Sequence, residues 1–136
     1  MEKLNTQVRP YRLSVVMMVK NEAKNLSITL PALAGWVDEI IVLDSGSSDD
    51  SQRLVEAAGG KWYVNTNWPG FGKQRQIAQS YATGDWILAL DADEEITEEL
   101  KNSILKVISE KPDNTVYGIK RIDCIFGHEI DNKYWA

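Results

Sequence analysis

The chain has 136 residues, a formal net charge of −5 and 43% hydrophobic residues. This length fits one domain that can bury a core of its own. The negative charge argues against a protein that binds nucleic acid along its phosphates. The single cysteine, Cys124, excludes an internal disulfide and fits a reducing compartment. Since no segment is long enough to span a bilayer, we expect a cytoplasmic protein, either free or bound peripherally at the inner face of the membrane.

Residues 1–12 are polar, include Pro10 and predict a flexible lead-in, and residues 13–136 predict a single domain. In that domain, short apolar runs alternate with segments of helical periodicity. Strands are expected at 13–19, 39–43, 61–64 and 86–90, with a hairpin formed by a strand within 115–126 and a partner from 129. Helices are expected over about 25–35, 49–58, 73–82 and 97–110, the first interrupted by Pro31. The expected capping residues are Asn25, Ser48 or Asp49, and Thr97. The alternation indicates an α/β fold with a mostly parallel sheet and helices on both faces.

Polar residues follow each of the first four expected strands. Ligands bind beyond the carboxyl ends of the strands in sheets of this kind. The four polar segments are Lys-Asn-Glu at 20–22, the Ser- and Gly-rich loop at 44–50, the loop at 65–72 and Asp-Ala-Asp at 91–93. The sequence therefore predicts one polar site at one edge of the sheet.

The apolar run from Trp86 to Leu90 predicts a strand that is buried on both faces. It ends in Asp91-Ala92-Asp93, and on an extended chain both carboxylates would point the same way. Two like charges about 5 Å apart repel by roughly 3 kcal/mol at an effective dielectric near 20. We therefore hypothesise that Asp91 and Asp93 hold Mg²⁺ or Mn²⁺ against a diphosphate, since these cations prefer oxygen ligands. The alternative is an acidic loop before a helix N-terminus, where carboxylates are favourable in any case.

Several other kinds of site are disfavoured by the motifs. The chain has no Gly-x-Gly-x-x-Gly after the first strand and no Gly-x-x-x-x-Gly-Lys-Ser/Thr, which argues against dinucleotide folds and phosphate-loop NTPases. Cysteine and histidine are too few for a structural zinc site. Two alternatives to a sugar-transferring enzyme stay open: a non-catalytic, receiver-like nucleotide- and metal-binding module, and a nucleotidyltransferase. The first would need an aspartate where Val64-Asn65 stands, and the second a Gly-rich basic loop where Lys20-Asn21-Glu22 stands.

Four segments together resemble a known family. They are Val-Lys-Asn-Glu at 19–22, Asp-Ser-Gly-Ser-Ser-Asp-Asp at 44–50, Ala-Thr-Gly-Asp-Trp at 82–86 and Leu-Asp-Ala-Asp-Glu at 90–94. In this order and spacing they look like the inverting glycosyltransferases of family 2, which have the GT-A fold. The segment Trp-Pro-Gly-Phe-Gly at 68–72, with Gln74 and Arg75, is similar to the lipopolysaccharide-core β-1,4-glucosyltransferase branch.

The resemblance implies a UDP-sugar donor, with glucose as the expected sugar, and a role for each matching residue. Asn21, Glu22 and Asp44 would contact the uridine, with Asp44 on the base. Arg75 would meet the diphosphate, and Lys73 is a weaker candidate for the same contact. Asp91 would lie by the ribose and the metal, and Asp93 would ligate the metal. The acceptor hydroxyl of a glycan or lipid-linked glycan would then attack the anomeric carbon with inversion.

Two features depart from the family pattern. Gln76 stands where family members usually have Asn, which puts that contact in question, and family chains continue well beyond residue 136. We therefore expect a truncated GT-A domain that lacks the acceptor-binding half and the catalytic base, and that binds donor and metal but turns over poorly alone. The weak candidates for a base are His128 and Glu129, which otherwise form a hairpin turn. Truncation would expose sheet edges and allow homo-oligomers to form.

Overall fold

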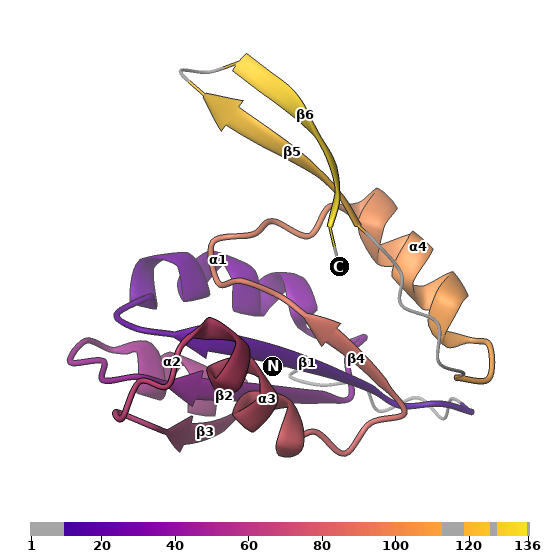
Figure 1. Ribbon diagram of the computed structural model, residues 1–136. Helices are drawn as coiled ribbons and strands as arrows, with labels where there is room; N and C mark the ends of the chain where they lie inside the picture. Colours follow the sequence, from indigo (N-terminus) through magenta and orange to yellow (C-terminus); the bar gives the residue numbers. More distant parts are fainter. Residues whose placement is uncertain (1–9, 113–118, 126–127, 136) are drawn as a thin grey trace.

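The computed structural model describes residues 10–112, 119–125 and 128–135. A four-stranded sheet forms its centre, in the order β3-β2-β1-β4, and every neighbouring pair is parallel. The strands are β1 (Leu13–Val19), β2 (Glu39–Asp44), β3 (Lys61–Val64) and β4 (Trp86–Ala89) (Figure 1). Because all four run the same way, their carboxyl ends meet at one edge, as the sequence predicts.

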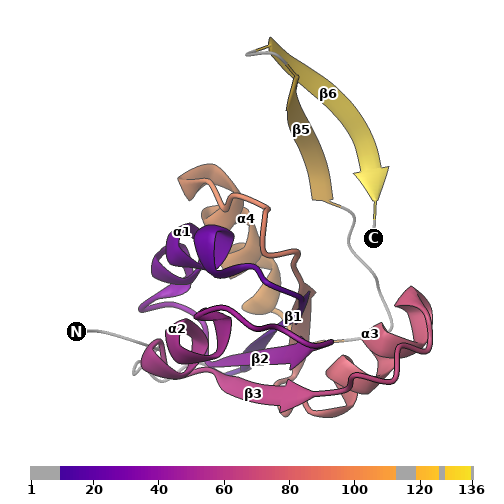
Figure 2. The same cartoon turned by 90° about the vertical axis from the view of Figure 1, so that its left-hand side faces the viewer.

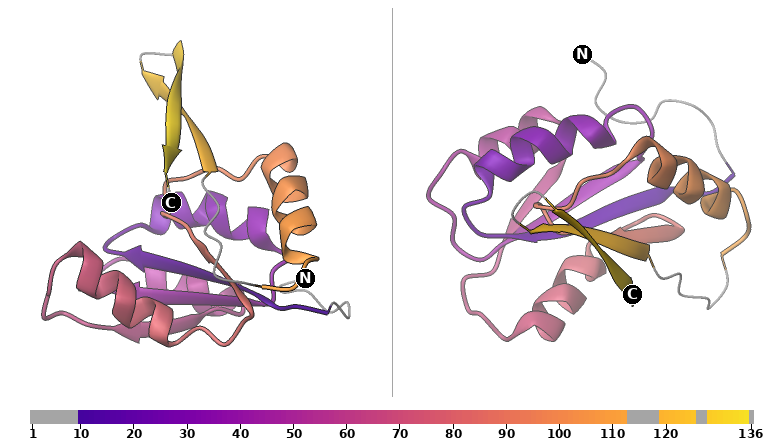
Figure 3. Two further views of the ribbon diagram at one scale, coloured as in Figure 1. Left: turned by 45° about the vertical axis from the view of Figure 1, so that its right-hand side comes forward. Right: turned by 90° about the horizontal axis from the view of Figure 1, so that it is seen from above.

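Helices cover both faces of this sheet. They are α1 (Ala23–Leu33), α2 (Ser51–Ala57), α3 (Phe71–Ser80) and α4 (Glu98–Ile108). The larger core joins α1, α2 and α4 to one face, and the smaller core holds Ala78 of α3 against Val16, Ile41 and Leu43 on the other face. Figures 2 and 3 show α1 and α4 on one side of the sheet and α3 on the opposite side. The predicted α/β fold is confirmed.

The central strands β1 and β2 are apolar along most of their length and are buried almost throughout. The expectation that β4 is buried on both faces is wrong. β4 lies at an edge of the four-stranded sheet, where only β1 pairs with it, and the side chain of Ile87 is 45% exposed. An apolar run alone does not say whether a second strand will pair with it.

The helix cores match the predicted periodicity better than the helix starts do. Thr97 caps α4 as expected, since its Oγ1 accepts a hydrogen bond from the N–H of Leu100 at 3.1 Å. The other predicted caps are wrong: α1 begins after Glu22 rather than at Asn25, and α2 begins after Asp50 rather than at Ser48 or Asp49. α3 begins at Phe71, two residues before the predicted start.

A buried carboxylate closes the amino-terminal end of the sheet. The side chain of Glu39, in β2, is 4% exposed and accepts hydrogen bonds from Ser14 Oγ at 2.8 Å, the N–H of Thr83 at 2.8 Å, Thr83 Oγ1 at 3.0 Å and Lys61 Nζ at 2.9 Å. Burial favours a raised pKa, but these hydrogen bonds outweigh it and lower the pKa of Glu39 from 4.5 to about 2. Glu39 thus joins β1, β2, β3 and the segment that leads into β4.

The remaining strands form the predicted hairpin. β5 (Ile119–Ile125) and β6 (His128–Trp135) pair antiparallel and stand clear of the four-stranded sheet (Figure 1). Most of the predicted lead-in (residues 1–9) and most of the segment that joins α4 to β5 lie outside the described residues. Among the helices of the described part, none combines the length and the apolar composition needed to cross a bilayer.

Candidate functional site

The loop after β1 and the loop after β2 are tied together by hydrogen bonds. The N–H of Asn21 donates to Ser47 Oγ at 2.7 Å, and the N–H of Ser48 donates to Asn21 Oδ1 at 2.7 Å. Asn21 has φ 52°, a left-handed conformation that asparagine adopts more easily than most residues. The two loops therefore hold each other at the carboxyl edge of the sheet.

The same two loops meet again at the start of α1. The N–H of Glu22 donates to Ser51 Oγ at 3.0 Å, and the N–H of Ala23 donates to Asp49 Oδ2 at 3.1 Å. A hydrogen bond from the Ser51 hydroxyl lowers the pKa of the exposed Asp49 carboxyl. Glu22 is half-buried, and its Oε2 accepts a hydrogen bond from Asn25 Nδ2 at 2.8 Å. This explains what Asn25 does in place of capping the helix.

Asp44 organises the loop that follows it. Its side chain is 3% exposed. Its Oδ2 accepts from the N–H of Gly46 at 3.1 Å, and both carboxylate oxygens accept from the N–H of Ser47 at 2.9 and 3.0 Å, with the Ser47 hydroxyl bound to Oδ1. A carboxylate has about four acceptor positions, so these three donors, one of them shared between both oxygens, occupy most of them. Asp44 lies at the predicted edge of the sheet, and its carboxylate mainly holds the loop that follows it.

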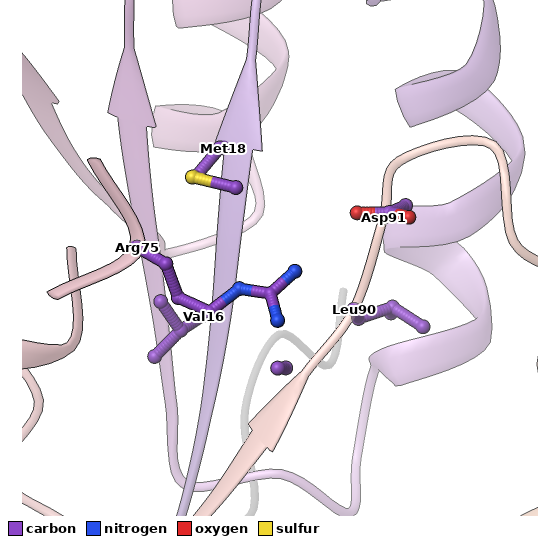
Figure 4. Close-up of a pocket in the computed structure, with 6 residues that line it drawn as sticks. Val16, Met18, Arg75, Leu90 and Asp91 are labelled. Atoms are coloured by element: carbon purple, nitrogen blue, oxygen red, sulfur yellow. The ribbon is translucent and has the colours of Figure 1, made fainter. Parts of the chain in front are cut away.

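Arg75 reaches over the sheet from α3. A shallow hollow at the carboxyl ends of β1 and β4 is lined by Val16, Met18, Arg75, Ala89, Leu90 and Asp91. Figure 4 shows that Arg75 and Asp91 approach this hollow from opposite sides. Within the described part of the chain, the guanidinium of the half-buried Arg75 has no ion-pair or hydrogen-bond partner. Lys73, in the first turn of α3, is exposed.

Asp91 and Asp93 lie in a turn, which corrects the prediction of an extended chain. The N–H of Glu94 donates to the carbonyl oxygen of Asp91 at 3.0 Å, and the N–H of Asp91 donates to Glu94 Oε1 at 2.8 Å. Ala92, between the two aspartates, is 4% exposed and its carbonyl oxygen accepts from Thr29 Oγ1 at 2.6 Å. Asp91 and Asp93, which flank Ala92 in the sequence, are both exposed.

The donor set at this turn fits a hard cation that shares its ligands with a substrate. Among the described residues, no group of three or more histidine, cysteine, aspartate or glutamate side chains is arranged to hold a metal ion. A closed metal site is therefore not formed by these side chains. Mg²⁺ is commonly held by one or two carboxylates together with substrate phosphates, and two exposed carboxylates at the end of β4 meet that requirement.

The two candidates for a base lie in the hairpin, and two aromatic residues lie around the start of α3. His128 begins β6 opposite Ile125, and Glu129 pairs with Cys124, which agrees with the hairpin alternative, but their side chains are outside the described part. Trp68 and Phe71 precede and begin α3, pack edge to face with their ring centroids 4.9 Å apart, and are 47% and 75% exposed.

One pair of amides was not assigned a role from the sequence. Asn65, directly after β3, donates from Nδ2 to Oε1 of Gln74 at 3.0 Å, and its N–H donates to the carbonyl oxygen of Asp44 at 2.8 Å. The two amides are nine residues apart across a loop, so periodicity gives no sign of the contact. The only sign of this contact in the sequence is that Gln74 is a polar residue on the face of α3 that also buries Ala78.

Comparison with known proteins identifies the family. The model described as Glycosyl transferase family 2 matches residues 14–133. An uncharacterized glycosyltransferase of Rickettsia felis is 34% identical over 122 residues, which make up 90% of this chain and 42% of the relative. The lipopolysaccharide core biosynthesis glycosyltransferase LpsC of Rhizobium meliloti is 24% identical over 125 residues, 85% of this chain and 44% of LpsC.

Solved structures agree with this fold. TarS 1–349 of S. aureus superposes with a TM-score of 0.58 at 27% identity, over 71% of this chain and 32% of TarS, and its complex with UDP gives 0.57. The glucosyl-3-phosphoglycerate synthase of Mycobacterium tuberculosis in complex with UDP gives 0.51 at 29% identity, over 63% of this chain and 35% of the synthase.

The described sheet and helices have the Rossmann-like GT-A arrangement of glycosyltransferases. The chain belongs to glycosyl transferase family 2, which favours a glycosyltransferase over the receiver-like module and the nucleotidyltransferase. The chain spans less than half the length of the curated relatives it matches here.

Proposed function

We propose that this chain binds the nucleoside diphosphate part of a UDP-sugar at the carboxyl edge of its sheet, as part of a glycosyltransferase. The observation that carries the proposal is Arg75, a half-buried cation that has no anionic partner among the described residues and borders the hollow between β1 and β4. A cation in that setting favours a bound anion, because taking charge out of water is costly unless an opposite charge compensates it. The UDP complexes of two proteins with this fold support a diphosphate as the anion.

The other site residues take roles by their place along the edge. The interlocked loops that hold Asn21, Glu22 and Asp44 form the nucleoside end, and Lys73 and Arg75 form the diphosphate end. Asp91 and Asp93 hold Mg²⁺ or Mn²⁺ at the turn after β4. When bound, such a cation neutralises charge on the departing diphosphate. The residues of this chain supply the oxygen ligands, the guanidinium and the loop geometry that orient the donor.

The transfer itself is a substitution at the anomeric carbon. An oxygen of the acceptor forms a bond to that carbon while the bond to the diphosphate oxygen breaks, the electron pair leaves with UDP, and a base takes the proton of the acceptor hydroxyl. Inversion follows when the attack comes from the face opposite UDP. We assign no base; His128 and Glu129 remain candidates.

The proposed acceptor follows from the name of a relative. The likeness to LpsC supports a lipopolysaccharide-core or similar lipid-linked glycan, and glucose is the proposed donor sugar. We place the protein in the cytoplasm, where nucleotide-sugar donors would be met, with peripheral membrane association and homo-oligomers as further proposals.

Calorimetry of this chain with UDP, CMP and GDP, each with and without Mn²⁺, tests the proposal. We expect UDP to bind more tightly than the other two and to bind more tightly with Mn²⁺ than without it. The metal dependence should disappear in Asp93→Ala. Equally weak or absent binding of all three nucleotides would reject a UDP-sugar site. Unchanged metal dependence of UDP binding in Asp93→Ala would remove Asp93 from the site.

A further inference from the structure

Gln74, the residue before Arg75 in α3, is completely buried but only partly hydrogen-bonded. Its exposed fraction is 0%, and its Oε1 accepts from Asn65 Nδ2 at 3.0 Å. Its Nε2 has no hydrogen-bond partner among the residues that the structure describes. A buried donor without a partner costs free energy that an apolar side chain of the same size would not. The amide at this position therefore provides something that a leucine or methionine would not.

In the first turn of α3, Gln74 is the residue that is buried against the rest of the fold. Gly70, which precedes the helix, provides no side-chain cap, and Phe71, Gly72 and Lys73 are exposed. The buried residues of α3 are Gln74 and Ala78, so Gln74 is the buried residue of the first turn. Its hydrogen bond to Asn65 joins that turn to the end of β3.

Asn65 connects this attachment to the opposite end of the proposed site. Its N–H donates to the carbonyl oxygen of Asp44 at 2.8 Å, and the carboxylate of Asp44 holds Gly46 and Ser47 in the loop that Asn21 also contacts. A continuous set of hydrogen bonds thus runs from the loops at the nucleoside end to Gln74. Arg75 is the next residue, and its guanidinium borders the hollow (Figure 4).

We propose that Gln74 is a positioning residue: its amide, held by Asn65, sets the first turn of α3 so that Arg75 faces the diphosphate. It acts through Arg75 and does not touch the ligand. This inference rests on the proposed function, because it assumes that the group at Arg75 is the diphosphate of UDP. It predicts that loss of the amide weakens binding of the diphosphate but not of the nucleoside.

The test uses Gln74→Met, which keeps the length of the side chain and removes both the hydrogen bond to Asn65 and the unpaired donor. Because the unpaired donor is removed as well, we expect the variant to fold, and thermal unfolding checks this. We expect the dissociation constant for UDP to rise about tenfold, and that for uridine, measured by NMR titration, to stay within about twofold. Asn65→Ala removes the same hydrogen bond from the other side and should show the same selectivity.

Two controls separate positioning from general damage. Gln52→Met makes the same change at an exposed position of α2 and should leave both constants unchanged. In an Arg75→Ala background, Gln74→Met should add less than about twofold to the loss of UDP affinity, because the residue through which it acts is gone.

Equal weakening of UDP and uridine, no change in either, or a full tenfold loss in the Arg75→Ala background would each overturn the positioning role. If the unsubstituted chain binds no UDP, the proposed function fails and this inference fails with it. If the unsubstituted chain binds UDP and Gln74→Met binds it equally well, only the positioning role is lost.

Discussion

Both ends of the parallel sheet carry polar side chains, but they differ in whether all of these side chains have hydrogen-bond partners. At the amino-terminal end, the carboxylate of Glu39 accepts four hydrogen bonds from three neighbouring segments. At the carboxyl end, the loops are also tied together, yet Arg75 and the Nε2 of Gln74 find no partner in the described part of the chain. A satisfied buried group stabilises the fold, whereas an unpaired cation beside a hollow is available to a ligand. The first end therefore serves folding, and the second is the end where we propose that the donor binds.

Loss of Glu39 should be the most damaging change to stability. We expect Glu39→Ala to lower the free energy of unfolding by about 3–4 kcal/mol, because it leaves the buried Ser14 hydroxyl and the N–H of Thr83 without an acceptor. Urea unfolding measures this change. Glu56→Ala, at an exposed position of α2, is the control and should cost little. If Glu39→Ala changed UDP affinity while leaving stability intact, the division between the two ends would be wrong.

The same carboxylate predicts a dependence of stability on pH. The pKa of Glu39 is lowered from 4.5 to about 2 in the folded chain, so its contribution is fully present above pH 4.5 and is lost as the pH falls toward 2. That contribution is on the order of 3 kcal/mol. The free energy of unfolding should therefore fall more steeply between pH 4.5 and 2 in the unsubstituted chain than in Glu39→Gln. Parallel curves would contradict the lowered pKa.

At the carboxyl end the expected effect is on binding. We expect Arg75→Ala to weaken UDP binding by about 2 kcal/mol, roughly 30-fold, because hydrogen bonds to charged groups contribute in this range. Stability should change little, since the guanidinium has no partner in the described part of the fold. Arg53→Ala, which removes an exposed arginine paired with Asp50 in α2, is the matched control. Equal effects of the two substitutions on UDP affinity would contradict a specific role for Arg75.

A smaller effect on stability is expected at two glycines around the start of α3. Gly70 has φ 99°, which a side chain adopts only with strain, whereas Gly72 lies inside α3 with open space around its Cα. We expect Gly70→Ala to cost about 1 kcal/mol of stability and Gly72→Ala to stabilise the chain by up to about 1 kcal/mol. Thermal unfolding of both variants checks this. The reverse order would mean that the start of α3 is misplaced.

Much of this division could be predicted from the sequence. The apolar runs of β1 and β2 predicted their bounds closely, because strands buried on both faces contain few polar residues to obscure their ends. The polar segments after the strands were correctly predicted to meet at one edge of the sheet, because parallel strands bring their carboxyl ends together; that this edge binds a ligand stays a prediction. The family resemblance then supplied proposed roles for single residues, which spacing alone could not.

The rest depends on contacts that no local pattern records. The edge position of β4 is set by which strands pair, and an apolar run does not contain that information. The side chain of Glu94 accepts a hydrogen bond from the N–H of Asp91 and so closes a turn there. The apolar run before Asp91 had instead predicted that the backbone would continue extended. The bond between Asn65 and Gln74 joins two segments across a loop, and only the folded chain brings them together.

The most direct test of the account is to map UDP onto the chain by NMR, following the backbone amide signals during titration with UDP and Mg²⁺. We expect the largest shifts at the carboxyl edge, at Asn21, Gly46 to Ser48, Arg75 and Asp91, with little change around Ser14, Glu39 and Thr83. Shifts centred on Glu39 and Thr83, or no shifts at saturating UDP, would contradict the placement of the binding site.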